Sequence, residues 1–158
     1  MKLWRIAVET RRYAANDISG GGAAINPGRW NEAAEAVLYT APTIAMAVLE
    51  TSAHIDDGGL PLNRYLVELE VPPAIWRKRQ TLAHTDMPAA WNAIPAGAAS
   101  ARIGSGWTRS LRSAILLVPS VIVPEEHVAL VNPAHADAAH IAASVTRPFE
   151  YHRFFRRG

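Results

Sequence analysis

Apolar residues alternate with polar ones in several parts of the chain, and this pattern predicts β-strands. The alternation is clearest in residues 63–71, where Tyr65, Val67, Leu69 and Val71 share one side. Since neighbouring side chains of a strand point to opposite faces, that side is expected to face the core. Looser alternation and short apolar runs predict six further strands. They cover residues 2–8, 37–40, 114–118, 121–123, 128–131 and 149–155.

A run that is apolar on every face predicts one helix. It follows Pro42 and continues through Leu49, and Glu50 stands at its end. Proline suits the first turn of a helix, because its missing N–H would lack a partner there in any case. Since the run has no polar stripe, this helix is expected to be mostly buried.

The other segments predict loops and short helices. Residues 17–24 contain three consecutive glycines, which are typical of a loop. Such a loop either lets a ligand approach the backbone or is a flexible connection, and the sequence favours neither. Short helices and loops are expected around Trp91 in residues 77–100, followed by a short segment at 107–112 and a small helix at 138–143. Strands with a few helices predict the α+β class.

Length and composition indicate one domain spanning residues 1–158. The chain has 158 residues, of which 49% are hydrophobic and 19% charged, which excludes a wholly disordered protein. No apolar stretch approaches the roughly 20 residues that span a bilayer, and the first residues do not resemble a signal peptide. We therefore expect a soluble cytoplasmic protein without membrane contact. The absence of cysteine excludes disulfides and thiolate metal sites.

The charge is nearly balanced overall but uneven along the chain. A formal net charge of +2 gives no general field for nucleic acid, and none is expected as a direct partner. Arg147, Arg153, Arg156 and Arg157 gather near the C-terminus. This cluster is read as a solvated tail, with a basic patch for an acidic partner as the alternative.

Glu50 is the most informative single residue. A carboxylate at the end of an apolar helix is costly to dehydrate unless a cation or hydrogen-bond donors meet it. The residues alone leave two interpretations open. Glu50 is either a catalytic carboxylate or a structural one paired with Arg29 or with His54, one helical turn later.

Several motifs in a fixed order carry a resemblance to a known family. They are GRWN at residues 28–31, VLYT at 37–40, LE at 49–50, VPS at 118–120 and NPAH at 132–135. Together they resemble the RES-domain family, named after an arginine, a glutamate and a serine, here Arg29, Glu50 and Ser120. The resemblance covers nearly the whole chain. It implies a toxin of a two-gene toxin–antitoxin system that is folded somewhat like ADP-ribosyltransferase toxins, uses NAD⁺ as a substrate and is neutralised by an Xre-family antitoxin.

The implied chemistry gives roles to the candidate residues. Cleavage of the nicotinamide–ribose bond develops positive charge on the ribose, which a carboxylate such as Glu50 stabilises. The planar donor fork of Arg29 fits a pyrophosphate. Tyr39 is expected to stack on the nicotinamide or ribose, although a core tyrosine fits equally well. Ser120 is expected to hydrogen-bond to NAD⁺ or to Glu50.

Weaker expectations concern the surroundings of the site. Trp30 is near enough to Arg29 to line a pocket, and Arg5 either enters the site or reaches solvent. His54 and His135 are candidates without a defined role. The remaining histidines have no metal-ligand spacing, so no metal is expected.

The fate of the ADP-ribose is a separate expectation. The family is associated with ADP-ribosylation of proteins and with NAD⁺ breakdown by hydrolysis or phosphorolysis. We expect mono-ADP-ribosyl transfer to a cellular protein, with a degradative NAD⁺ glycohydrolase or phosphorylase as the alternative. Arginine-specific transferases carry a second glutamate two residues before the catalytic one. Val48 stands there in this chain, so an arginine acceptor is not expected.

Two other classes compete with an NAD⁺-consuming enzyme. One is a non-catalytic binding module in which Arg29 and Glu50 form a buried ion pair. The other is an RNA-binding or RNA-cleaving toxin, which ranks last because no RNA-binding sequence signature is present.

Overall fold

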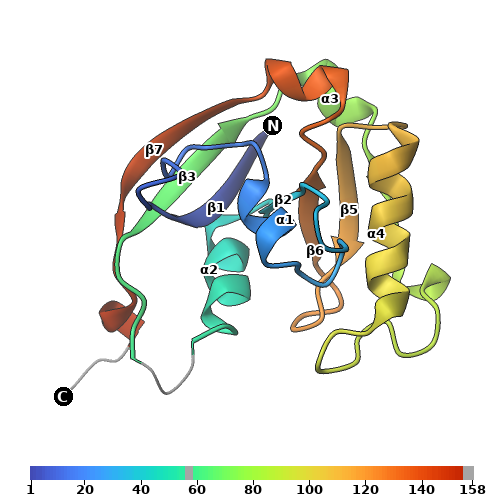
Figure 1. Cartoon of the computed structure of the whole chain (residues 1–158), viewed down its shortest axis with the longest axis horizontal. Coiled ribbons are helices and arrows are strands. Elements are labelled where there is room, and N and C mark those ends of the chain that lie inside the picture. Colours follow the sequence, from blue (N-terminus) through green and yellow to red (C-terminus); the bar gives the residue numbers. More distant parts are fainter. Residues whose placement is uncertain (56–58, 155–158) are drawn as a thin grey trace.

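Two β-sheets form the framework of the structure, a computed structural model that describes residues 1–55 and 59–154 (Figure 1). The first sheet has the order β1 (Lys2–Val8), β3 (Arg64–Glu70) and β7 (Ala142–Phe149), and its strands are antiparallel. The second has the order β2 (Leu38–Thr40), β6 (His127–Val131), β5 (Ile115–Pro119) and β4 (Gln80–Thr81), and only β4 runs parallel to its neighbour. A bridge between Trp4 and Ala41 connects the two sheets.

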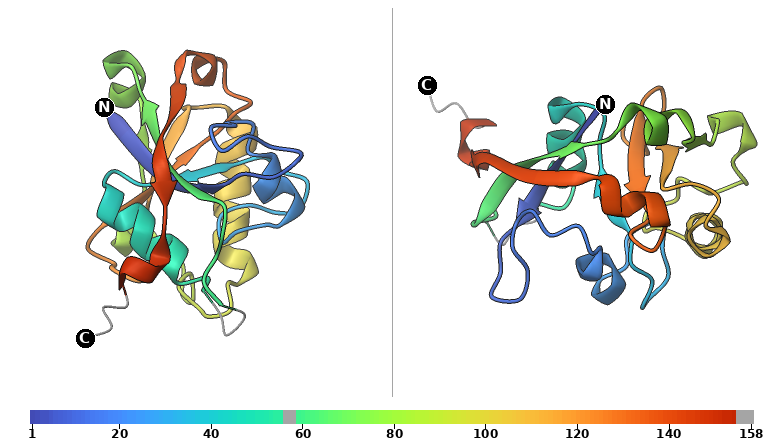
Figure 2. Two further views of the ribbon diagram at one scale, coloured as in Figure 1. Left: turned by 90° about the vertical axis from the view of Figure 1, so that its left-hand side faces the viewer. Right: turned by 90° about the horizontal axis from the view of Figure 1, so that it is seen from above.

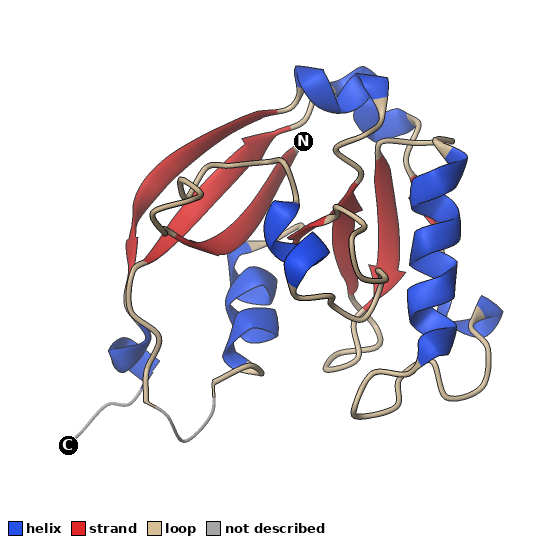
Figure 3. Ribbon diagram, viewed as in Figure 1, coloured by secondary structure: helices blue, strands red, loops and turns tan. Residues whose placement is uncertain are grey.

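Helices lie around these sheets, as Figure 3 shows. Helix α2 (Ile44–Ser52) lies against β1, and α4 (Ala98–Ser110) lies along the outer side of the second sheet, away from the first (Figure 2). The shorter helices are α1 (Gly21–Ile25), α3 (Pro73–Arg77) and the 3₁₀ helices η1 (His84–Asp86), η2 (Ala136–His140) and η3 (Tyr151–Phe154). The predicted α+β class is therefore confirmed.

Strand β5 is buried on both faces and joins two parts of the core. Ile115 and Leu117 pack in a cluster with Val67 and Leu69 of the first sheet. Leu116 and Val118 point the opposite way, into a cluster that contains Trp30, Trp91 and Trp107. Burial of both faces explains why this strand reads as an uninterrupted apolar run.

Two strand predictions are wrong. Residues 121–123 form a bend, because the backbone N–H groups of Ile122 and Val123 donate to the Ser120 hydroxyl and so close a turn. The last strand is β7, which ends at Phe149, earlier than expected. It lies at an edge of the first sheet with mostly exposed side chains, so burial imposes no alternation on its sequence. Of the expected strand at 149–155, residues 151–154 form η3, and residue 155 lies outside the described residues.

The predictions for the helix after Pro42 and for the glycine loop need three corrections. Helix α2 begins after Thr43, whose hydroxyl accepts a hydrogen bond from the N–H of Met46, and not at Pro42. It is also not mostly buried, because only Met46 and Ala47 are buried while Ile44 and Leu49 are each 37% exposed. Part of the expected glycine loop is helix α1.

Helix α4 was not predicted from the sequence. Residues 107–112 were expected to be a short segment, whereas α4 has 13 residues and contains two glycines. Gly104 is required by packing, because a Cβ atom there would overlap the carbonyl oxygen of Trp30. Glycine thus lets α4 approach the chain at Trp30. A Cβ on Gly106 would meet nothing within 4 Å.

The two glycines of α4 offer a matched test of this packing. We expect Gly104→Ala to lower the free energy of unfolding by about 1–3 kcal/mol, the usual cost of overpacking. Gly106→Ala should raise it by up to about 1 kcal/mol, since alanine favours a helix at an open position. Urea denaturation of both variants measures the difference. Equal unfolding midpoints would contradict the close contact at Gly104.

Candidate active site

A cleft of about 1120 Å³ lies among β1, β2, α2 and the loop at residues 94–97. This volume is slightly above the usual range of about 300–1,000 Å³ for small-molecule sites. Its wall combines apolar side chains with a few charged ones. The charged lining residues are Arg5, Asp17, Arg29, Glu50 and His54.

Glu50 occupies the last turns of α2 and is held by the end of β5. The Ser120 hydroxyl donates a hydrogen bond of 2.6 Å to Glu50 Oε1. The same hydroxyl accepts from the N–H groups of Ile122 and Val123, both at 3.1 Å, and Ser120 is 1% exposed. Because these two donors occupy the lone pairs of the oxygen, its proton is directed at the carboxylate. The expected contact between Ser120 and Glu50 is therefore present.

Arg29 faces the same cleft from the loop before β2. Its Nη1 donates to the carbonyl oxygens of Trp91 and Ala93, both at 2.9 Å. Burial lowers the pKa of Arg29, and the nearby charge of Glu50 partly opposes this effect. Among the described residues, Arg29 and Glu50 form no ion pair within 4.0 Å. The described residues therefore lack the buried ion pair between Arg29 and Glu50 that a non-catalytic binding module would have.

Asn31 fixes the loop around Arg29 and also orients Tyr39. The Asn31 side chain is 1% exposed, and its amide nitrogen donates to three backbone carbonyls, those of residues 23, 32 and 35. Its oxygen accepts from the N–H of Gly28 and from the Tyr39 hydroxyl, both at 2.9 Å. That hydroxyl accepts in turn from the N–H of Trp30. Burial raises the pKa of Tyr39, so the phenol stays protonated.

Gly28 adds a steric constraint to this arrangement. A Cβ atom at this position would lie 2.6 Å from the Tyr39 ring, so only glycine permits the observed contact. Tyr39 lines the cleft while its hydroxyl is engaged by the protein.

The structure places the other candidates at different depths. Trp30 is 3% exposed and packs against Trp91, with ring centroids 6.1 Å apart, so it supports the cleft wall from within the core. Arg5 enters the cleft and its Nη1 donates to the carbonyl of Asp17 at 3.1 Å. Burial lowers the Arg5 pKa, an effect that the charge of Asp17 opposes.

The two histidines have separate positions. His54 is exposed and lines the cleft just beyond α2. His135 does not line the cleft. Its Nδ1 accepts from the N–H of Asp137 and so caps η2.

Sequence reasoning missed two parts of the site. Asn31 belongs to a recognised motif, but its role depends on the backbone carbonyls of residues 23, 32 and 35. The carbonyls of Trp91 and Ala93 lie in the least readable segment and carry no side-chain signal. The one sequence cue for Asn31 is its place at the end of the motif GRWN, directly after Trp30.

Two further observations concern the part of the chain that the structure describes. No three His, Asp or Glu side chains gather there in a position to hold a metal ion, and the expectation of no metal stays a prediction. No helix in residues 1–55 and 59–154 is long and apolar enough to cross a membrane.

The fold is shared with a chain of a known toxin–antitoxin complex. The crystal structure of the M. tuberculosis MbcT–MbcA toxin–antitoxin complex contains a chain that matches with a TM-score of 0.64 and 14% identity, over 93% of this chain and 84% of that one. The family described as RES domain matches residues 2–153, and the chain belongs to that family. The resemblance inferred from the motifs is therefore confirmed.

Curated relatives carry toxin names. A Sphingobium sp. protein named "Prs ADP-ribosylating toxin" is 51% identical over 94% of this chain and 92% of its own length. A Yersinia enterocolitica protein named "Toxin Res" is 38% identical over 85% of this chain and 86% of its own length. A third relative, "Toxin Res" of Pseudomonas putida, is 32% identical over 87% of this chain and 88% of its own length.

Ser120→Ala tests how firmly Glu50 is held. We expect it to lower the free energy of unfolding by about 1–3 kcal/mol, because three hydrogen bonds at a buried hydroxyl are lost. Ser144→Ala is the control, since this serine is exposed in β7 and no hydrogen bond of its side chain is found among the described residues, so its loss should change stability by less than about 0.5 kcal/mol. Thermal and urea unfolding measure both variants. Equal losses would contradict a special role for Ser120.

Proposed function

We propose that this RES-domain toxin consumes NAD⁺ and transfers its ADP-ribose to a cellular protein. The observation that carries the proposal is a carboxylate, fixed by Ser120, that shares one cleft with Arg29 without an ion pair between them. Two opposite charges left available in one cleft suit a ligand with a cationic end and an anionic middle. NAD⁺ has both, in its nicotinamide ring and its pyrophosphate. The Sphingobium relative named as an ADP-ribosylating toxin supports the same reaction.

The proposed reaction begins with loss of nicotinamide. The bond between the ring nitrogen and ribose C1′ breaks, and its electron pair leaves with neutral nicotinamide. Positive charge then develops on C1′ and the ring oxygen, where the Glu50 carboxylate stabilises it. The nucleophile of the acceptor forms the new bond to C1′ and loses a proton. Ser120 keeps the carboxylate in one orientation throughout, so little reorganisation is needed.

Arg29 has the donors for the pyrophosphate. Nη1 is engaged by two carbonyls, and within the described part of the chain Nη2 and Nε make no hydrogen bond. These two donors suit a phosphate oxygen pair, since a guanidinium binds such groups in a forked geometry. Arg5 lines the same cleft and supplies a second positive charge. Tyr39 contributes its ring face, because its hydroxyl is bonded to Asn31.

Glu50→Gln tests the proposal, because it keeps the shape of the side chain and removes its charge. We expect nicotinamide release from NAD⁺ to fall about 10²–10³-fold with the fold retained. Glu70→Gln makes the same chemical change on an exposed residue that does not line the cleft, and should leave the rate unchanged. Nicotinamide release at the parent rate in the Glu50 variant would rule out this role.

The same reactions, run with labelled NAD⁺ in a cell lysate, identify the acceptor. Transfer should give a discrete labelled protein band that disappears with Glu50→Gln. Because Val48 stands in the position of the second glutamate of arginine-specific transferases, the modified side chain should not be arginine. Label found only in free ADP-ribose or its phosphorylated form would replace transfer with the hydrolytic or phosphorolytic reaction.

An antitoxin of the Xre family is the proposed neutralising partner, bound over the mouth of the cleft. Ile94 and Ile122 support this placement, since both line the cleft and are 86% and 42% exposed. The arginine-rich tail considered from the sequence includes residues 155–158, which lie outside the described residues. We expect calorimetry to show that the toxin–antitoxin complex binds NAD⁺ more weakly than the free toxin. Equal affinity would contradict occlusion.

A further inference from the structure

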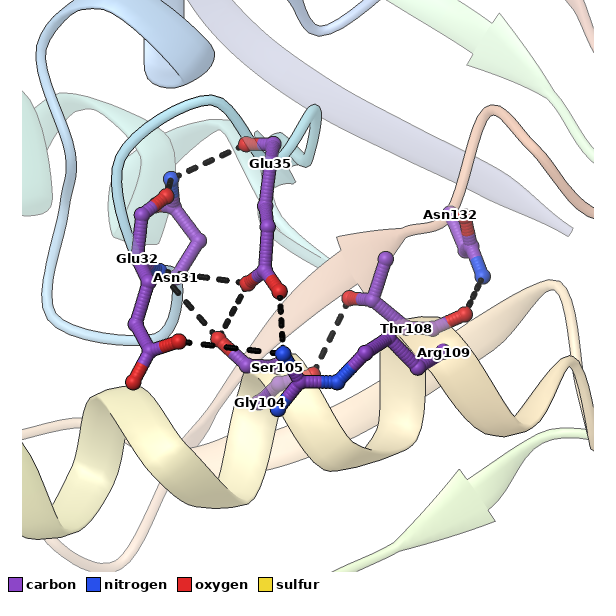
Figure 4. A network of polar contacts seen from close by, with 8 residues as sticks. All are labelled: Asn31, Glu32, Glu35, Gly104, Ser105, Thr108, Arg109 and Asn132. Atoms are coloured by element: carbon purple, nitrogen blue, oxygen red, sulfur yellow. Dashed lines mark hydrogen bonds and ion pairs between the residues drawn. The ribbon is translucent and has the colours of Figure 1, made fainter.

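A polar network connects α4 to the loop that carries Arg29, as Figure 4 shows. The Ser105 hydroxyl donates a short hydrogen bond to Glu35 Oε2. The N–H of Glu32 donates both to Ser105 Oγ at 3.2 Å and to Glu35 Oε2 at 3.3 Å. Ser105 is fully buried, so this contact between helix and loop is shielded from water. We refer to Ser105, Glu35 and Arg109 as the α4 clamp.

Arg109 supplies the charge of the clamp. Its guanidinium lies 3.0 Å from Glu35 Oε1 and 3.8 Å from Glu32 Oε2. The Glu35 side chain is only 17% exposed, so its carboxylate benefits from a cation beside it. The same carboxylate thus binds a helix hydroxyl, a loop N–H and an arginine.

The clamp meets the loop directly after Arg29. Gly104 lies against the carbonyl of Trp30, and the Glu32 N–H is bound two residues further on. The other side of Arg29 is held by Asn31, which binds the N–H of Gly28. The loop around Arg29 is therefore held by α4 in addition to Asn31 and to the hydrogen bond from the Trp30 N–H to Tyr39.

Helix α4 is itself fixed to the second sheet. The Asn132 side chain, which is fully buried after β6, donates to the carbonyl of Thr108 at 2.8 Å. The backbone N–H of Asn132 donates to the carbonyl of Ala114. The hydrogen bond from Asn132 to Thr108 therefore fixes α4 on the second sheet, and the clamp fixes the loop on α4.

We propose that Ser105 and Glu35 are positioning residues that set the place of the Arg29 guanidinium for NAD⁺. The proposal rests on the function proposed above, since it needs Arg29 to bind the pyrophosphate. Neither residue lines the cleft, so both act through the loop. Glu50 is held separately by Ser120, and none of the hydrogen bonds found for the described residues connects that pair to the clamp. Loosening the clamp should therefore weaken NAD⁺ binding more than the chemical step.

Ser105→Ala tests the separation of binding from chemistry. We expect the KM for NAD⁺ to rise about tenfold while kcat stays within about twofold, because displacement of a binding group by a fraction of an ångström is costly. Thr108→Ala is the matched control. Its hydroxyl bonds to the Gly104 carbonyl inside α4, so its loss affects the helix without affecting the loop. KM in the control should equal that of the parent.

A second pair of variants keeps the test decisive if Ser105→Ala does not fold. Glu35→Ala removes the acceptor and should raise KM about tenfold. Glu35→Gln loses the ion pair with Arg109, whose side chain is 64% exposed, but keeps an oxygen that accepts from Ser105 and from the Glu32 N–H, so it should restore KM to within about threefold of the parent. A rise in KM with Ala that Gln reverses supports positioning.

The outcomes also separate this inference from the proposed function. Parent protein that releases no nicotinamide from NAD⁺ refutes the proposed function itself. Active parent protein whose Ser105→Ala and Glu35→Ala variants lose thermal stability but keep the parent KM refutes the positioning role, leaving the clamp a structural contact. A fall in kcat at unchanged KM refutes it as well.

Discussion

The hydrogen bond from Ser120 to Glu50 is the contact on which the candidate site depends. It joins the end of β5, in the second sheet, to helix α2, which packs on the first sheet. Because α2 is only partly buried, its own packing does not fix the carboxylate, and the serine does. The serine is fixed in turn by the turn at residues 120–123, whose N–H groups direct its proton. One hydroxyl thus couples both sheets to the proposed reaction centre.

Arg29 reaches the cleft through an independent set of contacts. Asn31, the carbonyls of residues 91 and 93, and α4 hold it, and none of these contacts involves Glu50. Arg29 binds two backbone carbonyls and Glu50 binds the Ser120 hydroxyl, so each charge has its own hydrogen-bond partners and the two need not pair with each other. An ion pair between them would have to be broken before a ligand could use either charge. Separate anchoring leaves both charges available to a dinucleotide.

The sequence predicted those parts of the structure that local patterns determine. Strands β3 and β5 followed from alternation and from an uninterrupted apolar run, and Glu50, Arg29 and Ser120 from ordered motifs. Helix α4 was not predicted because its two glycines are unfavourable in a helix, whereas Gly104 serves a contact with Trp30, which is distant in the sequence. Residues 121–123 looked like a strand because apolar composition does not reveal a serine that closes a turn. The role of Asn31 depends on tertiary partners and has no local pattern.

A crystal structure of the Glu50→Gln protein with NAD⁺ tests the central claim most directly, that Arg29 and Glu50 act on one dinucleotide. The variant should retain NAD⁺ long enough to be seen. The account predicts the pyrophosphate within hydrogen-bonding distance of the Arg29 guanidinium, and the nicotinamide ribose against residue 50, still bonded to Ser120. NAD⁺ bound outside the cleft, or bound with its ribose remote from residue 50, would contradict it.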